Sequence, residues 1–393
     1  MKYYILQLKK LYKRFFEIQA HQSAGPNATP WRLVWNALPY IFLRNGYSFP
    51  PLSLFFIVNS KCNFKCQMCD VGQNYPESMF YQNLIGTGKD KGDYPVDAFK
   101  KLIDEVKSFS PYISITSTEP LLYKPLPEII RYVIASGLKI NVLTNGYLLE
   151  KRAEELVDSG LYSLNISIDG PPEIHNELRG IKDAHQRAVA GIMKVIELKK
   201  KKDTQYPYIG INSTITDLTA PHLVDMLKFL PMEHLVKVSF MTMVFLHQDL
   251  ADKHNALFGD KYRATKACLS GQADPFKVDV AALVEQSQLA KKMYPDKVYL
   301  YYQPDKEELE RYFFKPDVFM DGTKCVFPWF SAQILSNGDM VGLTRCFSVS
   351  FGNVITHSFK EVWLGQNMRD FRKDLQRYGR FPACTRCEGV LYE

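Results

Sequence analysis

The sequence lacks the features that mark several specialised protein classes. It contains no low-complexity tract, and lysines interrupt its apolar N-terminal residues too often for a signal peptide or a membrane span. The net charge of +7 is modest for 393 residues and permits an anionic partner without identifying one. The basic run KKKK at residues 199–202 is typical of a solvated helix end, so we expect no nucleic-acid partner.

A disulfide framework is missing as well. The chain has eight cysteines, but it is far longer than the small domains that need disulfide bridges, and 46% hydrophobic content is enough for a large core. Seven of the cysteines fall into two groups, which indicates metal binding in a protein that is not secreted. The first group is Cys62, Cys66 and Cys69, and the second is Cys325, Cys346, Cys384 and Cys387.

Residues 52–244 alternate between short apolar strands and helices. Strands are predicted at 52–59, 112–117, 139–145, 162–169, 209–216 and 236–244, and helices at 95–109, 126–136, 149–160, 184–201 and 220–230. Such alternation is typical of an α/β fold in which helices cover a parallel sheet. An open doubly wound sheet and a partial barrel both fit, and both place the chemistry at the C-terminal ends of the strands.

After about residue 245 the alternation stops. The sequence predicts a helix at 275–294, a strand at 298–304, a hairpin at 331–343 around an Asn-Gly turn, and an amphipathic helix at 358–379. We interpret this region as a smaller module whose four cysteines converge only when the module folds.

The first 20 residues have a basic amphipathic pattern. Apolar residues recur at helical spacing, and most of the lysines and arginines lie on the other side of the predicted helix. Such a helix can dock on the protein's own core or lie on a membrane surface. The apolar and aromatic segment at residues 31–46 favours membrane contact.

The first cysteine group has the spacing Cys-x3-Cys-x2-Cys. This spacing fits a tetrahedral zinc site poorly, because no fourth cysteine or histidine lies nearby in the sequence. Three cysteines can hold three corners of a four-iron cluster, which leaves one iron open to a substrate or cofactor.

The segment CNFKCQMC at the end of the first predicted strand resembles the signature of radical S-adenosylmethionine (SAM) enzymes. The resemblance implies a partial (β/α)6 TIM-like barrel over residues 51–265, behind an N-terminal helical segment at 1–50. It also implies a 4Fe–4S cluster whose open iron is chelated by SAM. In such enzymes an electron, here from a donor such as flavodoxin or ferredoxin, cleaves SAM to a 5′-deoxyadenosyl radical that abstracts hydrogen from the substrate. The catalytic residues would be Cys62, Cys66, Cys69 and Asp169.

Other motifs at the strand ends extend the resemblance. STEP at residues 117–120 stands where the family usually has Gly-Gly-Glu-Pro, so glycine-only torsions cannot be assumed there. TNG at residues 144–146, SID at 167–169, HNELRG with Arg179, and Asn212 also match the family in order. The resemblance assigns SAM binding to Ser117, Thr118, Glu119, Asn145, Ser167, Arg179 and Asn212.

The second cysteine group resembles the SPASM/Twitch extension of the same family, an α+β module placed here at residues 266–393 with a linker helix. The matching features are Cys325, the NGD hairpin, Cys346, the tryptophan-containing helix and the CTRC motif. Four cysteines are enough for one fully ligated auxiliary 4Fe–4S cluster that transfers electrons, which would make the protein an oxidoreductase. A structural zinc site is the alternative.

The eighth cysteine, Cys268, belongs to neither group. We expect it to be a small buried residue of the core rather than a hydrogen donor or substrate anchor.

The substrate is the least constrained prediction. The basic and aromatic N-terminus favours a lipid or lipid-linked molecule and a cytoplasmic protein peripheral at the inner face of the membrane, with contact through residues 1–20. A peptide or protein substrate is the alternative, although no N-terminal peptide-recognition domain is expected. A non-catalytic iron–sulfur redox or binding protein is the third possibility. The long loop at residues 70–95 is expected to form a wall or lid of the site.

Overall fold

The computed structural model describes residues 28–85, 92–320, 324–342 and 349–387. The predicted amphipathic helix at residues 1–20 and Cys346 lie outside the described residues.

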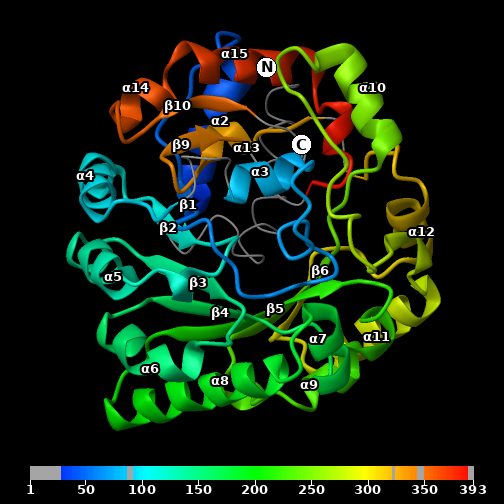
Figure 1. Ribbon diagram of the computed structural model, residues 1–393. Helices are drawn as coiled ribbons and strands as arrows, with labels where there is room; N and C mark the ends of the chain where they lie inside the picture. Colours follow the sequence, from blue (N-terminus) through cyan, green and yellow to red (C-terminus); the bar gives the residue numbers. More distant parts are fainter. Residues whose placement is uncertain (1–27, 86–91, 321–323, 343–348, 388–393) are drawn as a thin grey trace.

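One sheet forms the frame of the protein, and six of its strands follow each other in chain order (Figure 1). Each of the six pairs in parallel with its neighbours, which confirms the α/β partial-barrel prediction. The six strands are β1 (Ser53–Phe56), β2 (Tyr112–Ile115), β3 (Ile140–Thr144), β4 (Ser163–Ser167), β5 (Tyr208–Ile215) and β6 (Lys237–Thr242).

The chain after residue 265 extends this same sheet at both edges. Strand β7 (Val298–Leu300) pairs in parallel with β6, and β8 (Ser331–Ile334) pairs in parallel with β1. The predicted hairpin is confirmed, because β9 (Asp339–Val341) runs antiparallel to β8, and β10 (Ser350–Asn353) follows at the edge. The C-terminal region therefore shares its hydrogen-bonded frame with the barrel.

Helices cover the outer side of the sheet, and their apolar faces pack on its buried aliphatic residues (Figure 1). The predicted helices are confirmed as α4 (Val96–Val106), α5 (Leu126–Ala135), α6 (Leu149–Asp158), α8 (Ala184–Lys201), α9 (Leu223–Leu227) and α11 (Val280–Met293). Side chains along each strand alternate between the inner and the outer face of the sheet. Ile166 of β4 is on the outer face, because its side chain lies against Gly146 together with Ala188 of the covering helix α8.

Some elements differ from the sequence-based prediction. The long helix predicted at 358–379 is two helices, α14 (Phe359–Trp363) and α15 (Gln366–Tyr378), because Gly365 adopts an extended conformation and caps the second one. Four further helices were not predicted: α3 (Met79–Ile85), α7 (Pro172–Arg179), α10 (Gln248–Phe258) and α12 (Lys306–Phe314). Helix α2 (Pro30–Phe42) lies within the N-terminal segment that was expected to be helical. The short helix α13 (Phe327–Phe330) leads into β8.

Within the described ranges, no helix combines the length and apolar character needed to cross a bilayer.

Arg372 of α15 ties the C-terminal helices to the rest of the fold. Its side chain is fully buried and donates to the carbonyl oxygens of Pro328 (2.9 Å), Trp363 (2.9 Å) and Gly46 (3.3 Å). Its guanidinium also lies 4.1 Å from the centroid of the Trp363 ring. Burial lowers the pKa of Arg372 well below its usual value, so these carbonyls and the ring must stabilise the charge.

We expect Arg372→Ala to lower the free energy of unfolding by about 3 kcal/mol or more, because it creates a cavity and leaves buried carbonyl groups without a donor. Urea denaturation followed by circular dichroism measures this change. Arg131→Ala, at an exposed position of α5, is the matched control and should change stability by less than about 0.5 kcal/mol. Equal effects of the two variants would contradict the role of Arg372.

Candidate active site

The first three cysteines lie on the loop that follows β1, at the C-terminal edge of the parallel strands. The Cys69 amide donates to the Cys66 carbonyl at 3.2 Å, so the chain turns tightly between them. Burial, with smaller contributions from the neighbouring Cys69 and Cys62 thiols, raises the pKa of the Cys66 thiol to about 12. The three thiols are thus close enough to influence one another, as the spacing predicts.

Three glycines let other segments approach the backbone of this loop. A side chain at Gly72 would come within 2.5 Å of the Cys66 nitrogen, and one at Gly180 within 2.7 Å of the Lys65 carbonyl. A side chain at Gly271 would overlap the Gln67 carbonyl. These contacts fix the shape of the cysteine loop, and sequence reasoning missed all three.

Asp70, immediately after the last cysteine, is a buried anchor that the sequence analysis also missed. Its carboxylate accepts hydrogen bonds from the Ser78 hydroxyl (2.6 Å), the Ser270 hydroxyl (2.6 Å) and the Cys268 amide (2.9 Å). Asp70 therefore ties the cysteine loop to the segment around residue 270. Cys268 is buried as expected.

Glu119 is buried, and its carboxylate bonds to protein groups. It accepts from the Thr144 hydroxyl (2.7 Å) and from the amides of Asn145 (2.8 Å) and Leu121 (2.9 Å). Burial raises the pKa of Glu119, and these donors oppose the rise. Asn145 in turn donates to the Asn63 side chain at 2.8 Å, which links the end of β3 to the cysteine loop. These contacts indicate a positioning role for both residues.

Ser117 adopts a backbone conformation that glycine occupies more readily than any other residue. Its φ is +84°, a region that residues with a side chain rarely occupy. Sequence reasoning could not assume this torsion, and the surrounding chain imposes it. The next residue, Thr118, is buried and donates from its hydroxyl to the Asn59 carbonyl at 2.8 Å.

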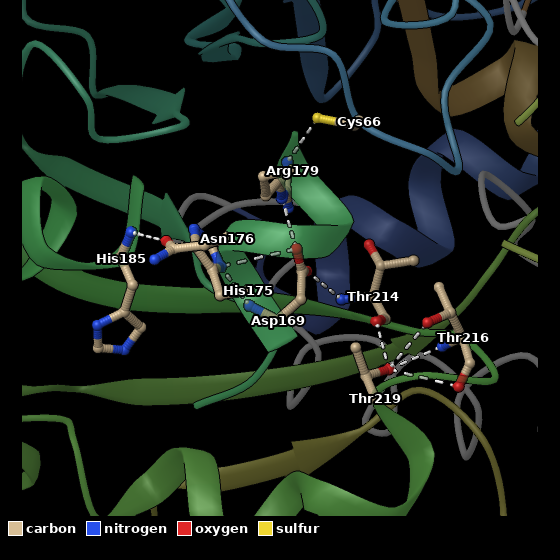
Figure 2. Close-up of polar contacts among 9 residues, drawn as sticks. All are labelled: Cys66, Asp169, His175, Asn176, Arg179, His185, Thr214, Thr216 and Thr219. Atoms are coloured by element: carbon tan, nitrogen blue, oxygen red, sulfur yellow. Dashed lines mark hydrogen bonds and ion pairs between the residues drawn. The ribbon is translucent and has the colours of Figure 1, made fainter. Parts of the chain in front are cut away.

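Asp169 and Arg179 connect β4, α7 and the cysteine loop (Figure 2). The Arg179 Nε donates to Asp169 Oδ2 at 2.5 Å, and its Nη1 lies 3.8 Å from the Cys66 sulfur. Asp169 Oδ1 accepts from the Thr214 amide at 2.8 Å. Burial opposes the charge on Arg179, but Asp169 and Cys66 raise the pKa of Arg179 above its usual value. A fixed cation therefore lies beside a cysteine thiol.

A histidine supports Asp169 from behind. The Asp169 amide donates to His175 Nδ1 at 3.1 Å, and burial lowers the pKa of His175 to about 3, so its ring is neutral (Figure 2).

Ser167 and Asn212 are register partners on β4 and β5, and both are partly exposed. Asn212 Oδ1 is buried and has no hydrogen-bond partner among the described residues. This amide oxygen is available to a ligand.

The donor set fits a four-iron cluster better than a single ion. Among the described residues, no three His, Cys, Asp or Glu side chains converge closely enough to hold one metal ion. In a cubane cluster each thiolate binds a different iron, so the thiols need to surround a volume rather than a point. Three neighbouring thiols on one loop, of which Cys62 is exposed, are compatible with this requirement.

The structure brings three cysteines of the second group together. Burial raises the pKa of Cys325 to about 12, and the charge of Cys387 raises it further. Burial raises the pKa of Cys384 as well, and so do the nearby thiols of Cys387 and Cys325. Between the last two cysteines, Arg386 donates to the Lys315 carbonyl (2.7 Å) at the end of α12, which fixes the CTRC motif. Cys346 lies outside the described residues, so its place in this group stays a prediction.

The torsion of Ser117 gives a prediction about strain. We expect Ser117→Gly to raise the free energy of unfolding by up to about 1 kcal/mol, because glycine adopts positive φ without a steric cost. SAM affinity, measured by calorimetry, should stay within a factor of about two, because the backbone is already in the glycine conformation.

Ser110 is the matched control, since it also has positive φ (+50°) but lies at the other end of β2. Ser110→Gly should stabilise the protein without changing SAM affinity. A Ser117→Gly variant that is clearly less stable than wild type would contradict the strain argument.

Several curated proteins are similar to part of this chain. An Fe-coproporphyrin III synthase of Methanosarcina barkeri is 27% identical over 187 residues, which are 47% of this chain and 42% of that protein. A probable GTP 3′,8-cyclase of Methanococcus maripaludis is 27% identical over 216 residues, or 52% of this chain and 68% of that protein. The chain thus spans less than half the length of the first relative and about two thirds of the second.

Solved structures show the same fold. SuiB of Streptococcus suis bound to S-adenosylmethionine superposes with a TM-score of 0.58 at 14% identity, covering 93% of this chain and 79% of that one. The enzyme anSMEcpe with bound AdoMet and a peptide gives a TM-score of 0.51 at 20% identity, covering 82% of each chain. At these identities the similarity concerns the fold alone.

Family models match both cysteine regions. The radical SAM superfamily model matches residues 56–227, and the SPASM model, an iron-sulfur cluster-binding domain, matches residues 325–388. The cofactors of these domains are a 4Fe–4S cluster with SAM and an auxiliary iron–sulfur cluster. The chain belongs to the radical SAM superfamily and carries a C-terminal SPASM domain.

Proposed function

We propose that the protein is a radical SAM oxidoreductase that binds its first cluster on Cys62, Cys66 and Cys69. When bound, this cluster and SAM supply a reductive C–S cleavage that yields a 5′-deoxyadenosyl radical for hydrogen abstraction. The observation that carries the proposal is the Arg179 guanidinium, which Asp169 holds 3.8 Å from the Cys66 sulfur. A buried, always protonated guanidinium at this place suits the carboxylate of SAM.

The remaining polar residues divide into three roles. Glu119 and Asn145 have their bonds satisfied within the protein, so they position the loops at the ends of β1, β2 and β3. Ser167 and Asn212 are partly exposed on the inner face of the sheet and are the side chains free to contact SAM or the substrate. Ser117 and Thr118 would act through their backbone.

The second cysteine group would hold the auxiliary cluster. Cys325, Cys384 and Cys387 supply three ligands in the described part of the chain, and we assign the fourth to Cys346. A fully ligated cluster has no open iron, so its role would be one-electron transfer during a two-electron oxidation. Cys384 is buried, and the hydrogen bond from Arg386 to the Lys315 carbonyl would limit movement of the CTRC motif.

For the substrate, a polar reacting group attached to a lipid is our preferred class. Contact of the protein with a membrane is supported by an apolar stripe on the outer face of α2. In this stripe Trp31 is 72% exposed, Trp35 46% and Phe42 54%. Exposed tryptophans beside a basic N-terminal segment are typical of proteins that bind at the interface of anionic membranes. The protein would then be cytoplasmic and peripheral, with flavodoxin or ferredoxin as electron donor. A peptide substrate is the alternative, since SuiB and anSMEcpe share the fold and have each been solved with a bound peptide.

The decisive test of the chemistry is 5′-deoxyadenosine release. The protein is reconstituted with iron and sulfide without oxygen and given SAM and a strong reductant, and the product is measured by chromatography. We expect Cys66→Ala to lower the release by about 100-fold or more, because the SAM-binding cluster loses a ligand.

Cys268→Ala is the matched control, because this buried cysteine belongs to neither group and contacts Asp70 through its backbone amide. It should retain release within a factor of about three. Wild-type protein that is loaded with iron at both sites but releases no 5′-deoxyadenosine would instead indicate an electron-transfer or binding protein.

Membrane contact can be tested separately. We expect the double variant Trp31→Ser, Trp35→Ser to lower the fraction of protein that floats with vesicles containing anionic lipid, by about threefold or more, because each indole contributes buried apolar area. Leu257→Ser is the control, since Leu257 is 70% exposed on a different helix, α10. Equal flotation of the double variant and wild type would remove the support for a membrane-bound substrate.

A further inference from the structure

The C-terminal module has two buried arginines, one on either side of Cys384, and their charges face different groups. Arg380 is 4% exposed and Arg386 is 2% exposed. The Arg386 guanidinium donates to the carbonyls of Tyr312 (2.6 Å) and Lys315 (2.7 Å), so its charge lies at the C-terminal end of α12. A cation at this end of a helix satisfies carbonyls that lack helical partners, which accounts for Arg386 as a structural residue.

Arg380 instead faces the second cysteine group. Its Nη2 donates to the carbonyl oxygen of Cys384, and its guanidinium lies 4.7 Å from the centroid of the Phe319 ring. By covalent geometry, a cation that bonds to the carbonyl of a cysteine lies within about 8 Å of the sulfur of that residue. The hydrogen bond therefore holds a buried positive charge close to a proposed cluster ligand.

The charge of Arg380 acts on two of the thiols. Burial raises the pKa of Cys325 and that of Cys384, and the positive charge of Arg380 opposes the rise at both. The thiolate is the form of cysteine that binds a metal. Arg380 thus favours negative charge on these sulfurs, in agreement with its hydrogen bond to Cys384.

A negative cluster at this place would respond to the same cation. When a four-iron cluster with four cysteine ligands takes up one electron, its negative charge grows by one unit, so a nearby cation stabilises the reduced form more than the oxidised form. Away from water, this attraction is stronger and is screened little by salt. Nearby charges are among the means by which a protein sets the reduction potential of its cluster.

We propose that Arg380 raises the reduction potential of the auxiliary cluster on Cys325, Cys384 and Cys387, and so makes this cluster an electron acceptor. The proposal rests on the proposed function, because it needs an iron–sulfur cluster on these cysteines. The guanidinium stays protonated in both redox states, so only one electron is exchanged. The cluster would gain this electron from the substrate radical, and an oxidised carrier such as flavodoxin or ferredoxin would remove it.

The test measures the midpoint potential of the auxiliary cluster by itself. Full-length protein with Cys62→Ala, Cys66→Ala and Cys69→Ala cannot form the first cluster, so it serves as the parent. It is reconstituted without oxygen, and the reduced cluster is followed by electron paramagnetic resonance in a redox titration. We expect Arg380→Gln to lower the ratio of reduced to oxidised cluster at a fixed potential at least tenfold, or 59 mV for one electron.

Further variants separate the charge from the hydrogen bond. The glutamine of Arg380→Gln can still donate to the Cys384 carbonyl, so this variant removes the charge alone. Arg380→Lys keeps the charge, and its ratio should stay within threefold of the parent. Arg377→Met is the matched control, because Arg377 is an exposed arginine on the last turn of α15 and water screens its charge. It should also stay within threefold.

Three results would overturn the role of Arg380. The first is an intact cluster with an unchanged midpoint in Arg380→Gln, and the second is an equal shift in Arg380→Lys. The third is loss of the cluster from Arg380→Gln, seen as a lower iron content, which would make Arg380 a structural residue. A parent protein that binds no cluster would instead refute the auxiliary site of the proposed function itself, so the two failures are distinguishable.

Discussion

The buried carboxylate of Glu119 is the interaction on which the arrangement of the active-site loops depends. It bonds to Thr144 and Asn145 at the end of β3, while the Glu119 backbone bonds to Asn59 and Lys61 just before the cysteine loop. One residue, through its side chain and its backbone, thus joins the C-terminal ends of three adjacent strands. Because a buried carboxylate is costly unless its oxygens are satisfied, the loops after β2 and β3 can move apart only by leaving that charge unpaired.

The sequence was sufficient to predict the strands, the outer helices and the cysteine loop, because these depend on local periodicity and spacing. Helices within irregular segments were not predictable in the same way. Residues 70–95 read as a loop, yet α3 forms there, and it begins where the Met79 amide donates to Thr265, which is far away in sequence. The extension of the sheet by β7 and β8 likewise depends on strand pairing between distant segments, which no local pattern encodes.

The same distinction applies to the site. Arg179 and Asp169 were identified by motif, and the structure brings them together beside Cys66. Asp70 and Gly271 carried no local signal, because each matters only through a partner that tertiary folding supplies. Ser117 shows the converse case, in which the residue type argues against a torsion that the surrounding fold nevertheless imposes.

The inner and outer faces of the sheet contribute to different properties of the molecule. Outward residues such as Leu164, Ile209 and Phe240 are fully buried under the helices, so most of the stability of the barrel comes from that side. The inner face can therefore carry unpartnered polar atoms at a stability cost that the outer face tolerates. Polar atoms that lower stability without a structural partner are expected where a ligand completes them. The Asn212 side chain carries such an atom, and the Asn212 carbonyl accepts from the Ile168 amide, one residue before Asp169.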